Sequence, residues 1–136
     1  MMQRRAFLDA NVLFSAAWTP GNGLLALWTK DDVLLYSSHY AAEEAERNLS
    51  DTDKRHRLAR LLESVTLVGP LLSEYMPAQG KDLPEKDRPI LLAAMAAQAN
   101  TLLTGDRTHF GRWYGKTISG ILVQRPSDFL QEKAEG

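Results

Sequence analysis

The sequence contains no cysteine, and this absence excludes several kinds of site. Without cysteine there can be no disulfide framework, no thiolate nucleophile and no zinc held by thiolates. Any metal site must therefore rest on oxygen ligands or on imidazole. The lack of disulfides is compatible with a cytoplasmic protein, and we expect that location.

A long apolar run is also missing. No stretch approaches the ~20 apolar residues that a membrane-spanning helix needs, so we expect no membrane association. Near the N-terminus, Arg4 and Arg5 precede the apolar residues 6–8, which is the order of a signal peptide. Asp9 and Asn11 interrupt this stretch before it reaches signal-peptide length, so we interpret it as part of the mature protein.

The sequence lacks an excess of charge of either sign, with 16 Lys and Arg against 17 Asp and Glu and a net charge of −1. A nucleic-acid partner would therefore have to be held by a local basic patch or through bound metal. Repeats, low-complexity segments and linkers are missing as well. The 136 residues, 44% of them hydrophobic, fit a single domain, 1–136, with a sizeable core.

The sequence does contain short apolar runs that alternate with helical segments. We expect strands at 5–8, 33–36, 65–68, 101–104 and 121–123, and helical segments at 12–18, 24–30, 38–49, after Ser50-x-x-Asp53, from Glu85, and in short form from Pro126. Ser37-Ser38 offers an N-cap for the helix that runs to about Leu49, and Ser50-x-x-Asp53 can cap the next helix. Pro89 must lie in a first helical turn. Because the apolar strands are continuous, they predict a parallel sheet with helices on both faces, an α/β fold.

Four acidic residues are expected at one edge of this sheet. In an open parallel sheet the site lies at the carboxyl ends of the strands. Asp9 directly follows the first strand, and Asp106 follows the strand at 101–104. Glu44 lies on the helix after the second strand, and Asp87 lies in the first turn of the helix that starts near Glu85. Four consecutive strand–helix units thus each deliver one carboxylate to the same edge.

Glu44 competes with the neighbouring Glu43 and Glu46 for this role. At ~100° per residue, one side of the helix collects Tyr40, Ala41, Glu44, Ala45 and Asn48. Glu43 and Glu46 point away from that side, so Glu44 is the acid that we expect to face inward. Asp87 has an alternative role, because an acid at a helix N-terminus is often only a cap.

Clustered carboxylates repel one another unless cations bind them, and oxygen ligands suit Mg²⁺ or Mn²⁺. Asp106 is then interpreted as ending its strand at a metal-binding edge. Gly105 would give the backbone room there, and the Thr104 hydroxyl could hold a carboxylate or a water. Taken singly, each acid could instead be an ordinary turn or cap residue.

Three segments resemble the motifs of PIN-domain nucleases. "FLDANVLFSA" resembles the opening strand and turn, "SSHYAAEEAERNL" the second acidic motif, and "KDRPILLAAMAAQANTLLTGDRTHF" the third and fourth motifs. The resemblance extends from about Phe7 to Ser127 and implies a three-layer α/β/α sandwich with a central parallel sheet. It implies an acidic quartet with two polar supports: Asp9, Glu44, Asp87 and Asp106, with Asn11 and Thr104. Family members often have Asp, Asn or His where this chain has Thr108, with His109 beside it, which leaves the occupancy of a second metal site open.

The resemblance also implies an activity: hydrolysis of RNA phosphodiester bonds with Mg²⁺ or Mn²⁺, leaving 5′-phosphate products. Asp9, Asp87 and Asp106 would be the metal ligands, and Glu44 would be a ligand or would orient the attacking water. Many stand-alone prokaryotic members are similar to VapC-type toxins of toxin–antitoxin modules. An antitoxin partner and a homodimer are therefore expected too.

Arg107, Arg112 and Lys116 follow the last acid and are the candidates for contacts with RNA phosphates. A denser basic cluster at 54–60 lies opposite a leucine stripe, and we interpret it first as a solvated helix face. Trp113, next to these candidates, is interpreted as a packing anchor rather than a residue that stacks on bases.

Two other functions remain open. One is a non-catalytic PIN module that binds RNA or a protein partner and keeps its acids for structure. The other is a Mg²⁺ phosphohydrolase, because Asp9-x-Asn11 is similar to a phosphatase nucleophile loop. The rest of that loop offers little of what a phosphatase needs. Metal-dependent RNA cleavage that one acid substitution abolishes would separate the nuclease from the binding module.

Overall fold

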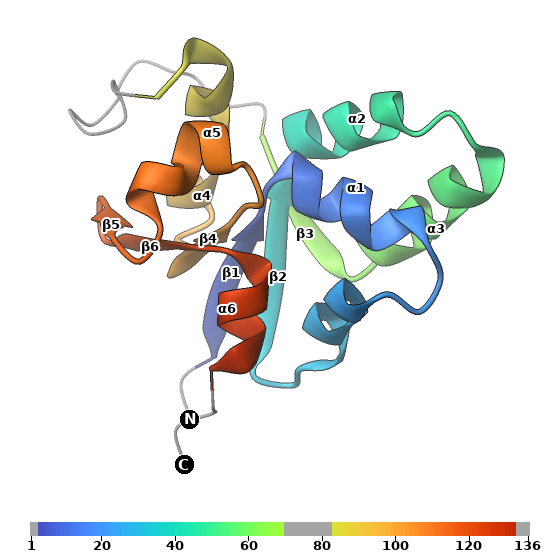
Figure 1. The fold of residues 1–136 in the computed structure, drawn as a ribbon, viewed down its shortest axis with the longest axis horizontal. Coiled ribbons are helices and arrows are strands. Elements are labelled where there is room, and N and C mark those ends of the chain that lie inside the picture. The colour runs from blue at the N-terminus through green and yellow to red at the C-terminus, as the bar shows by residue number, and fades with distance from the viewer. Residues whose placement is uncertain (1–2, 70–82, 133–136) are drawn as a thin grey trace.

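The chain folds around one central, mostly parallel sheet, which a computed structural model describes over residues 3–69 and 83–132 (Figure 1). Its strand order is β3-β2-β1-β4-β6-β5. The strands are β1 (Arg4–Leu8), β2 (Val33–Ser38), β3 (Val65–Val68), β4 (Thr101–Leu103), β5 (Thr117–Ile118) and β6 (Ile121–Gln124). Every pairing is parallel except that of β5 with β6. The predicted α/β/α architecture is confirmed.

Helices flank the sheet. They are α1 (Ala10–Trp18), η1 (Gly23–Thr29), α2 (His39–Asn48), α3 (Thr52–Leu62), η3 (Glu85–Asp87), α4 (Arg88–Ala96), α5 (Arg107–Phe110), η4 (Gly111–Trp113) and α6 (Pro126–Gln131), where η marks a 3-10 helix. The first helix, α1, packs against α2 and α3, whereas α4 packs against β2. Figure 1 shows α1, α2 and α3 grouped together, with α4 and α5 lying apart from them.

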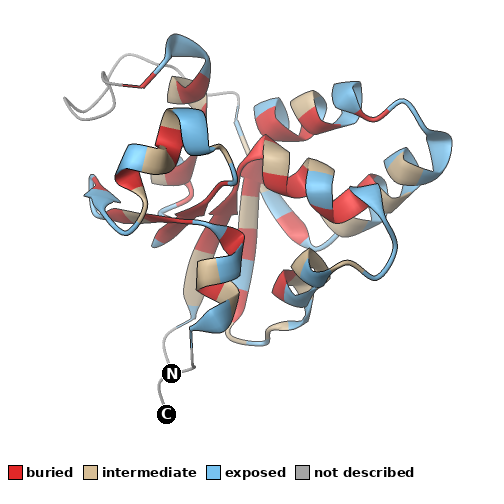
Figure 2. Cartoon of the chain, viewed as in Figure 1, coloured by how far each residue is buried: buried red, intermediate tan, exposed pale blue. Residues whose placement is uncertain are grey.

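The core is centred on β1 and β4, the two middle strands of the sheet (Figure 2). All of β4 is buried, and so are the last three residues of β1. Phe7, Leu8, Leu102 and Leu103 have no exposed surface. This is why residues 6–8 of β1 and 102–103 of β4 are continuously apolar, since helices cover each face of a parallel sheet. No helix in the described part of the chain is long and apolar enough to cross a membrane.

Local signals in the sequence placed most elements correctly. The Ser38 hydroxyl accepts a hydrogen bond of 3.0 Å from the backbone N–H of Ala41 and caps α2, so the cap is the second serine of the predicted Ser37-Ser38 pair. Pro89 lies in the first turn of α4, also as predicted. The Ser50 cap is wrong, because the carboxylate of Asp51 caps α3 instead, accepting from the backbone N–H of Asp53.

Several elements differ from the predictions, among them η4, which had not been predicted. Residues 23–29 form a 3-10 helix rather than an α-helix, and α5 had not been predicted. The antiparallel strand β5 had also not been predicted, because two residues are too short to show a period. Its turn into β6 uses Ser119 and Gly120 at φ 51° and 81°, which is the backbone that tight hairpins require. Most of the segment at 71–84, for which the sequence shows no pattern, lies outside the described residues.

Candidate active site

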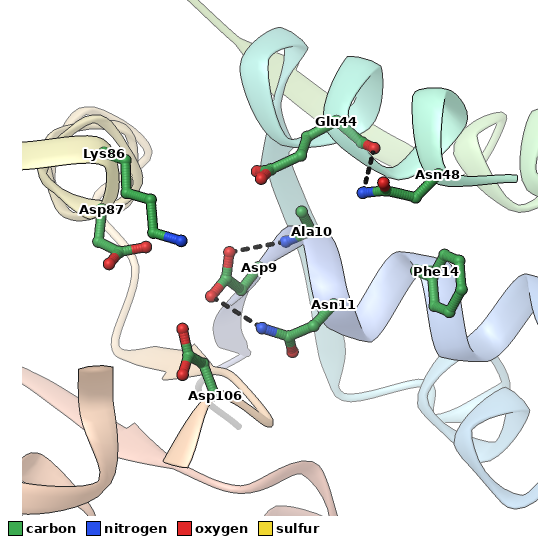
Figure 3. A pocket seen from close by; sticks show the side chains of 9 residues that line it. All are labelled: Asp9, Ala10, Asn11, Phe14, Glu44, Asn48, Lys86, Asp87 and Asp106. Atoms are coloured by element: carbon green, nitrogen blue, oxygen red, sulfur yellow. Dashed lines mark hydrogen bonds between the residues drawn. The ribbon is translucent and has the colours of Figure 1, made fainter. Parts of the chain in front are cut away.

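One pocket, with a volume of about 540 Å³, collects all four of the predicted acids (Figure 3). Its lining residues are Asp9, Ala10, Asn11, Phe14, Glu44, Asn48, Lys86, Asp87 and Asp106. Among these residues, the acids come from segments as far apart in sequence as β1 and β4. The expected convergence at the carboxyl edge of the sheet is therefore what the fold produces.

Each acid is positioned by the start or the face of a helix. Asp9 caps α1, with its Oδ1 2.7 Å from the backbone N of Ala10, and Asp106 caps α5. Asp87 ends η3 and directly precedes α4. Glu44 lies in the middle of α2 and lines the pocket, whereas Glu43 and Glu46 are exposed. The helical period therefore correctly predicted that Glu44, and not Glu43 or Glu46, faces the pocket.

The end of β4 is tied to the end of β1 through the hydroxyl of Thr104, which is fully buried. This hydroxyl donates to Oδ2 of Asp9 over 2.8 Å. It accepts from Nδ2 of Asn11 at 3.2 Å and from the backbone N of Asp106 at 3.1 Å. One donated and two accepted bonds use the full capacity of a hydroxyl. Thr104 therefore holds the carboxylate of Asp9 and the backbone of Asp106.

Asn11 completes this network. Its Oδ1 accepts from the backbone N of Gly105 at 2.7 Å, so the amide is oriented with Nδ2 toward Oδ2 of Asp9, 3.2 Å away. A Cβ atom on Gly105 would lie 3.4 Å from Oδ1 of Asn11, close to an ordinary contact. The room that Gly105 leaves is therefore a weaker requirement than the sequence suggested.

The carboxylate of Asp9 is buried, with 5% of the residue exposed. Burial raises its pKa from 3.8 to about 6, although hydrogen bonds from Thr104 and Ala10 lower it, and the nearby charges of Asp87 and Glu44 add to the rise. Burial also raises the pKa of Asp87, while His109 lowers it. Crowded, buried carboxylates hold their charge at a cost in free energy, which a cation in the pocket would relieve.

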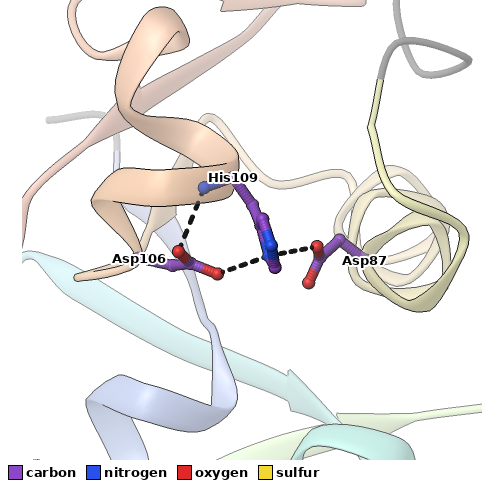
Figure 4. Close-up of side chains that lie close together, drawn as sticks. All are labelled: Asp87, Asp106 and His109. Atoms are coloured by element: carbon purple, nitrogen blue, oxygen red, sulfur yellow. Dashed lines mark hydrogen bonds and ion pairs between the residues drawn. The ribbon is translucent and has the colours of Figure 1, made fainter.

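His109 lies between two of the acids (Figure 4). Its Nδ1 is 2.7 Å from Oδ2 of Asp87 and 2.9 Å from Oδ2 of Asp106. Neither contact has the alignment of a hydrogen bond. Within the described residues, Nδ1 of His109 and the buried Oδ2 of Asp87 thus both lack a hydrogen-bond partner.

The donor set fits a divalent cation. One ligand atom from each of Asp87, Asp106 and His109 lies within 4.8 Å of the other two. The Oδ2 atom of Asp87, buried and without a hydrogen bond, is the kind of oxygen that a metal ion satisfies. Asp9 and Glu44 line the same pocket and bring further oxygen atoms. The residues present therefore suit a hard or borderline metal ion.

A family model described as a PIN domain matches residues 5–108. The chain belongs to the PIN domain family, a family of nucleases. The comparison with curated protein sequences gave no match.

Solved structures share the fold of this PIN domain. VapBC-1 from nontypeable Haemophilus influenzae is 17% identical with a TM-score of 0.59, over 90% of this chain and 98% of that chain. VapBC2 from Rickettsia felis, bound to a DNA fragment from their promoter, is 16% identical with a TM-score of 0.58, over 89% and 98%. FitAcB from Neisseria gonorrhoeae is 19% identical with a TM-score of 0.53, over 90% and 98%. At these identities the likeness shows the fold alone.

The predicted phosphate-binding cations of this PIN domain lie outside the pocket lining. Arg107 is exposed at the start of α5, directly after Asp106. Arg112 lies 5.4 Å from the centre of the Trp113 ring, and Lys116 is exposed just before β5. Trp113 is 9% exposed, in agreement with a packing role.

The basic cluster at 54–60 is only partly a solvated face. Arg57 donates from Nε to the carbonyl of Ala17 and from Nη2 to that of Trp18, and Lys54 lies 3.6 Å from the centre of the Trp18 ring. Arg55 donates to the carbonyl of Leu49. These cations therefore tie α3 to its neighbours, which weakens the case for a role in phosphate binding.

Reasoning from the sequence missed Lys86, and it named His109 only as the neighbour of Thr108, without predicting its contact with the acids. Lys86 lines the pocket, and Figure 3 shows its amine extending into the space among the acids. Its carbonyl accepts from the hydroxyl of Tyr40 at 3.0 Å, which joins η3 to α2. His109 stands three residues after Asp106, a spacing that would have predicted the contact if α5 had been expected there.

Proposed function

We propose that this PIN domain is a metal-dependent endoribonuclease and the toxin component of a toxin–antitoxin module. The observation that carries the proposal is the convergence of Asp9, Glu44, Asp87 and Asp106 on one pocket. Membership of the PIN domain family supports the nuclease, and the likeness in fold to two VapBC proteins and FitAcB supports a toxin of the VapC type.

Asp9, Asp87 and Asp106 would hold Mg²⁺ or Mn²⁺. When bound, the ion supplies Lewis acidity toward a phosphodiester and toward water. Thr104 and Asn11 fix the carboxylate of Asp9 from one side, so that its position does not depend on substrate. Positions fixed in advance matter because ligands that need not reorganise act more strongly on the charge that develops during reaction.

The proposed reaction is hydrolysis at phosphorus. A water oxygen forms the new P–O bond, the bond from phosphorus to the 3′ oxygen breaks, and the products carry a 5′-phosphate and a 3′-hydroxyl. The proton released by the water passes to a carboxylate, a role for which Glu44 is suited because it lines the pocket and is only partly buried. The departing 3′ oxygen takes its proton from solvent.

Partners follow from the same proposal. The substrate is RNA, with Arg107, Arg112 and Lys116 as its phosphate contacts. An antitoxin protein and a second copy of this chain are the proposed protein partners. Light scattering would test the homodimer, and purification from the native operon would test for a small co-purifying antitoxin. A strict monomer without such a protein would leave only the nuclease part of the proposal.

The decisive experiment is RNA cleavage by the purified protein with Mn²⁺ or Mg²⁺, compared with Asp9→Asn and Asp106→Asn. Each substitution removes one negative ligand with little change of shape, so we expect activity to fall by about a hundredfold or more. Asp53→Asn is the matched control, because Asp53 is exposed on α3 and does not line the pocket.

Chelation with EDTA should have the same effect as the acid substitutions. Cleavage that continues in EDTA, or products with 2′,3′-cyclic phosphate, would exclude hydrolysis by an activated water. RNA that binds without being cleaved under any metal condition would favour the non-catalytic PIN module instead.

A further inference from the structure

We propose that His109 is a ligand of the divalent ion and that its imidazole shifts the preference of the site from Mg²⁺ toward transition-metal ions. The inference rests on the metal site of the proposed function and adds to it a nitrogen ligand and a selectivity. It starts from the position of Nδ1, which lies within 3 Å of an oxygen of Asp87 and of an oxygen of Asp106.

The backbone explains why the imidazole lies there. Asp106 caps α5, and its Oδ1 accepts from the backbone N–H of His109 at 3.1 Å. This bond fixes the first turn of α5 and places the ring of His109 beside the second oxygen of the same carboxylate. Asp87 approaches from the other side at the end of η3, as Figure 4 shows. The three groups thus come from two segments that meet only in the folded chain.

The two separations that involve Nδ1 are those of neighbouring ligands around one ion. Two neighbouring ligands of an octahedral ion, each ~2.1 Å from the metal, stand ~3 Å apart. The observed separations of 2.7 and 2.9 Å from Nδ1 are close to this value. Ligands of a common ion all point at the ion and not at one another, so they approach closely without hydrogen-bond alignment. Nδ1 and Oδ2 of Asp87 show that combination, since they lie 2.7 Å apart and neither has a hydrogen-bond partner among the described residues.

A structural ion pair is the competing interpretation of the same contacts. An imidazolium that served only to pair the acids would direct its N–H at one carboxylate, since an aligned hydrogen bond is the stronger arrangement. Nδ1 is aligned with neither oxygen, and Oδ2 of Asp87 remains buried without a hydrogen bond among the described residues. A cation between the three groups would satisfy all of them.

The chemical consequence is a change in metal preference. Mg²⁺ binds oxygen and keeps much of its water, whereas affinity for nitrogen rises from Mn²⁺ through Co²⁺ to Ni²⁺. A site made of carboxylates alone would discriminate little in favour of the later ions. With His109 as a ligand, the imidazole increases the affinity of the site for Co²⁺ and Ni²⁺ and leaves its affinity for Mg²⁺ almost unchanged.

The first test is spectroscopic and needs no substitution. Mn²⁺ bound to the full chain should show the magnetic coupling of a directly bound imidazole nitrogen in pulsed electron paramagnetic resonance. His109→Gln should lose this signal. His56→Gln is the matched control and should retain it, because His56 is exposed on α3, away from the pocket. Bound Mn²⁺ without a nitrogen signal in the unaltered protein would overturn the inference.

The second test measures selectivity by calorimetry with Co²⁺ and Mg²⁺. We expect His109→Gln to weaken Co²⁺ binding by about tenfold or more and to leave Mg²⁺ binding within about threefold, since only the nitrogen ligand is lost. An unchanged ratio of the two affinities would contradict the role of His109 while leaving the proposed nuclease intact. Failure of the unaltered protein to bind any divalent ion would instead remove the proposed function itself.

Discussion

Thr104 donates a hydrogen bond of 2.8 Å to the buried carboxylate of Asp9, although 95 positions separate the two residues in the chain. They meet because β1 and β4 are neighbours in the sheet and both end at the pocket. The same hydroxyl accepts from the backbone of Asp106. One side chain therefore sets the distance between two of the proposed metal ligands.

Thr104→Val keeps the shape of this side chain and removes its hydroxyl. Oδ2 of Asp9 then loses a donor and the backbone N–H of Asp106 loses its acceptor. We therefore expect the free energy of unfolding, measured in urea with EDTA, to fall by about 1 to 3 kcal/mol. Thr104→Ser keeps the hydroxyl and should recover most of this stability. Equal stability of the valine variant and the unaltered protein would show that the network does not hold the site together.

The pKa of Asp9 predicts how stability depends on pH without metal. Its folded-state pKa of about 6 lies above the ordinary 3.8, so the folded state binds this proton more tightly than the unfolded chain does. The stability of the metal-free protein should therefore increase as pH falls from 7 through 6 toward 4. A pKa shift of about two units corresponds to a change in the free energy of unfolding on the order of 3 kcal/mol.

Asp9→Asn removes this titrating group and should flatten the profile. Part of the slope should remain, because the pKa of Asp87 is raised as well. The measurement is urea unfolding in EDTA between about pH 4.5 and pH 7.5, a range that extends to either side of the folded-state pKa of about 6. Identical pH profiles for the variant and the unaltered protein would mean that Asp9 titrates normally in the folded state.

Metal should stabilise the folded protein by mass action. An ion present at 100 times its dissociation constant adds about 2.7 kcal/mol if it binds only the folded state. We therefore expect millimolar Mn²⁺ or Mg²⁺ to raise Tm, and Asp106→Asn to lose most of that rise while Asp53→Asn keeps it. A Tm that does not respond to metal in any of the three proteins would argue for the non-catalytic PIN module.

Removing the Arg107 side chain should weaken RNA binding without changing the metal site. Arg107 is exposed and directly follows Asp106, so a phosphate in the pocket lies within reach of its segment. Arg107→Ala should raise KM more than it lowers kcat and should reduce the salt slope of binding by about one ion. Arg60→Ala removes an exposed cation on α3 and is the control. Equal effects of the two substitutions would mean that only the loss of positive charge matters and that Arg107 has no specific role in RNA binding.

The amino-acid sequence by itself determined most of the elements and singled out the four acids. Strands buried on both faces must be continuously apolar, and Pro89 can stand only in a first helical turn, so both could be recognised locally. Glu44 could be chosen over Glu43 and Glu46 because the period of a helix fixes which residues share a face. Asp9 and Asp106 were identifiable because Asp9 directly follows an apolar strand and Asp106 follows another after a short connection.

Only the tertiary structure decided what lies next to these acids. The contact of His109 with Asp87 depends on how α5 and η3 meet, and the bond between Thr104 and Asp9 depends on β4 pairing with β1. Asp51 caps α3 instead of Ser50 because α3 begins at Thr52, and a start one residue earlier would have made Ser50 the cap. Strand order and helix placement follow from long-range packing of the whole core, whereas periodicity and capping are local, and contacts between distant segments leave no regular spacing in the chain.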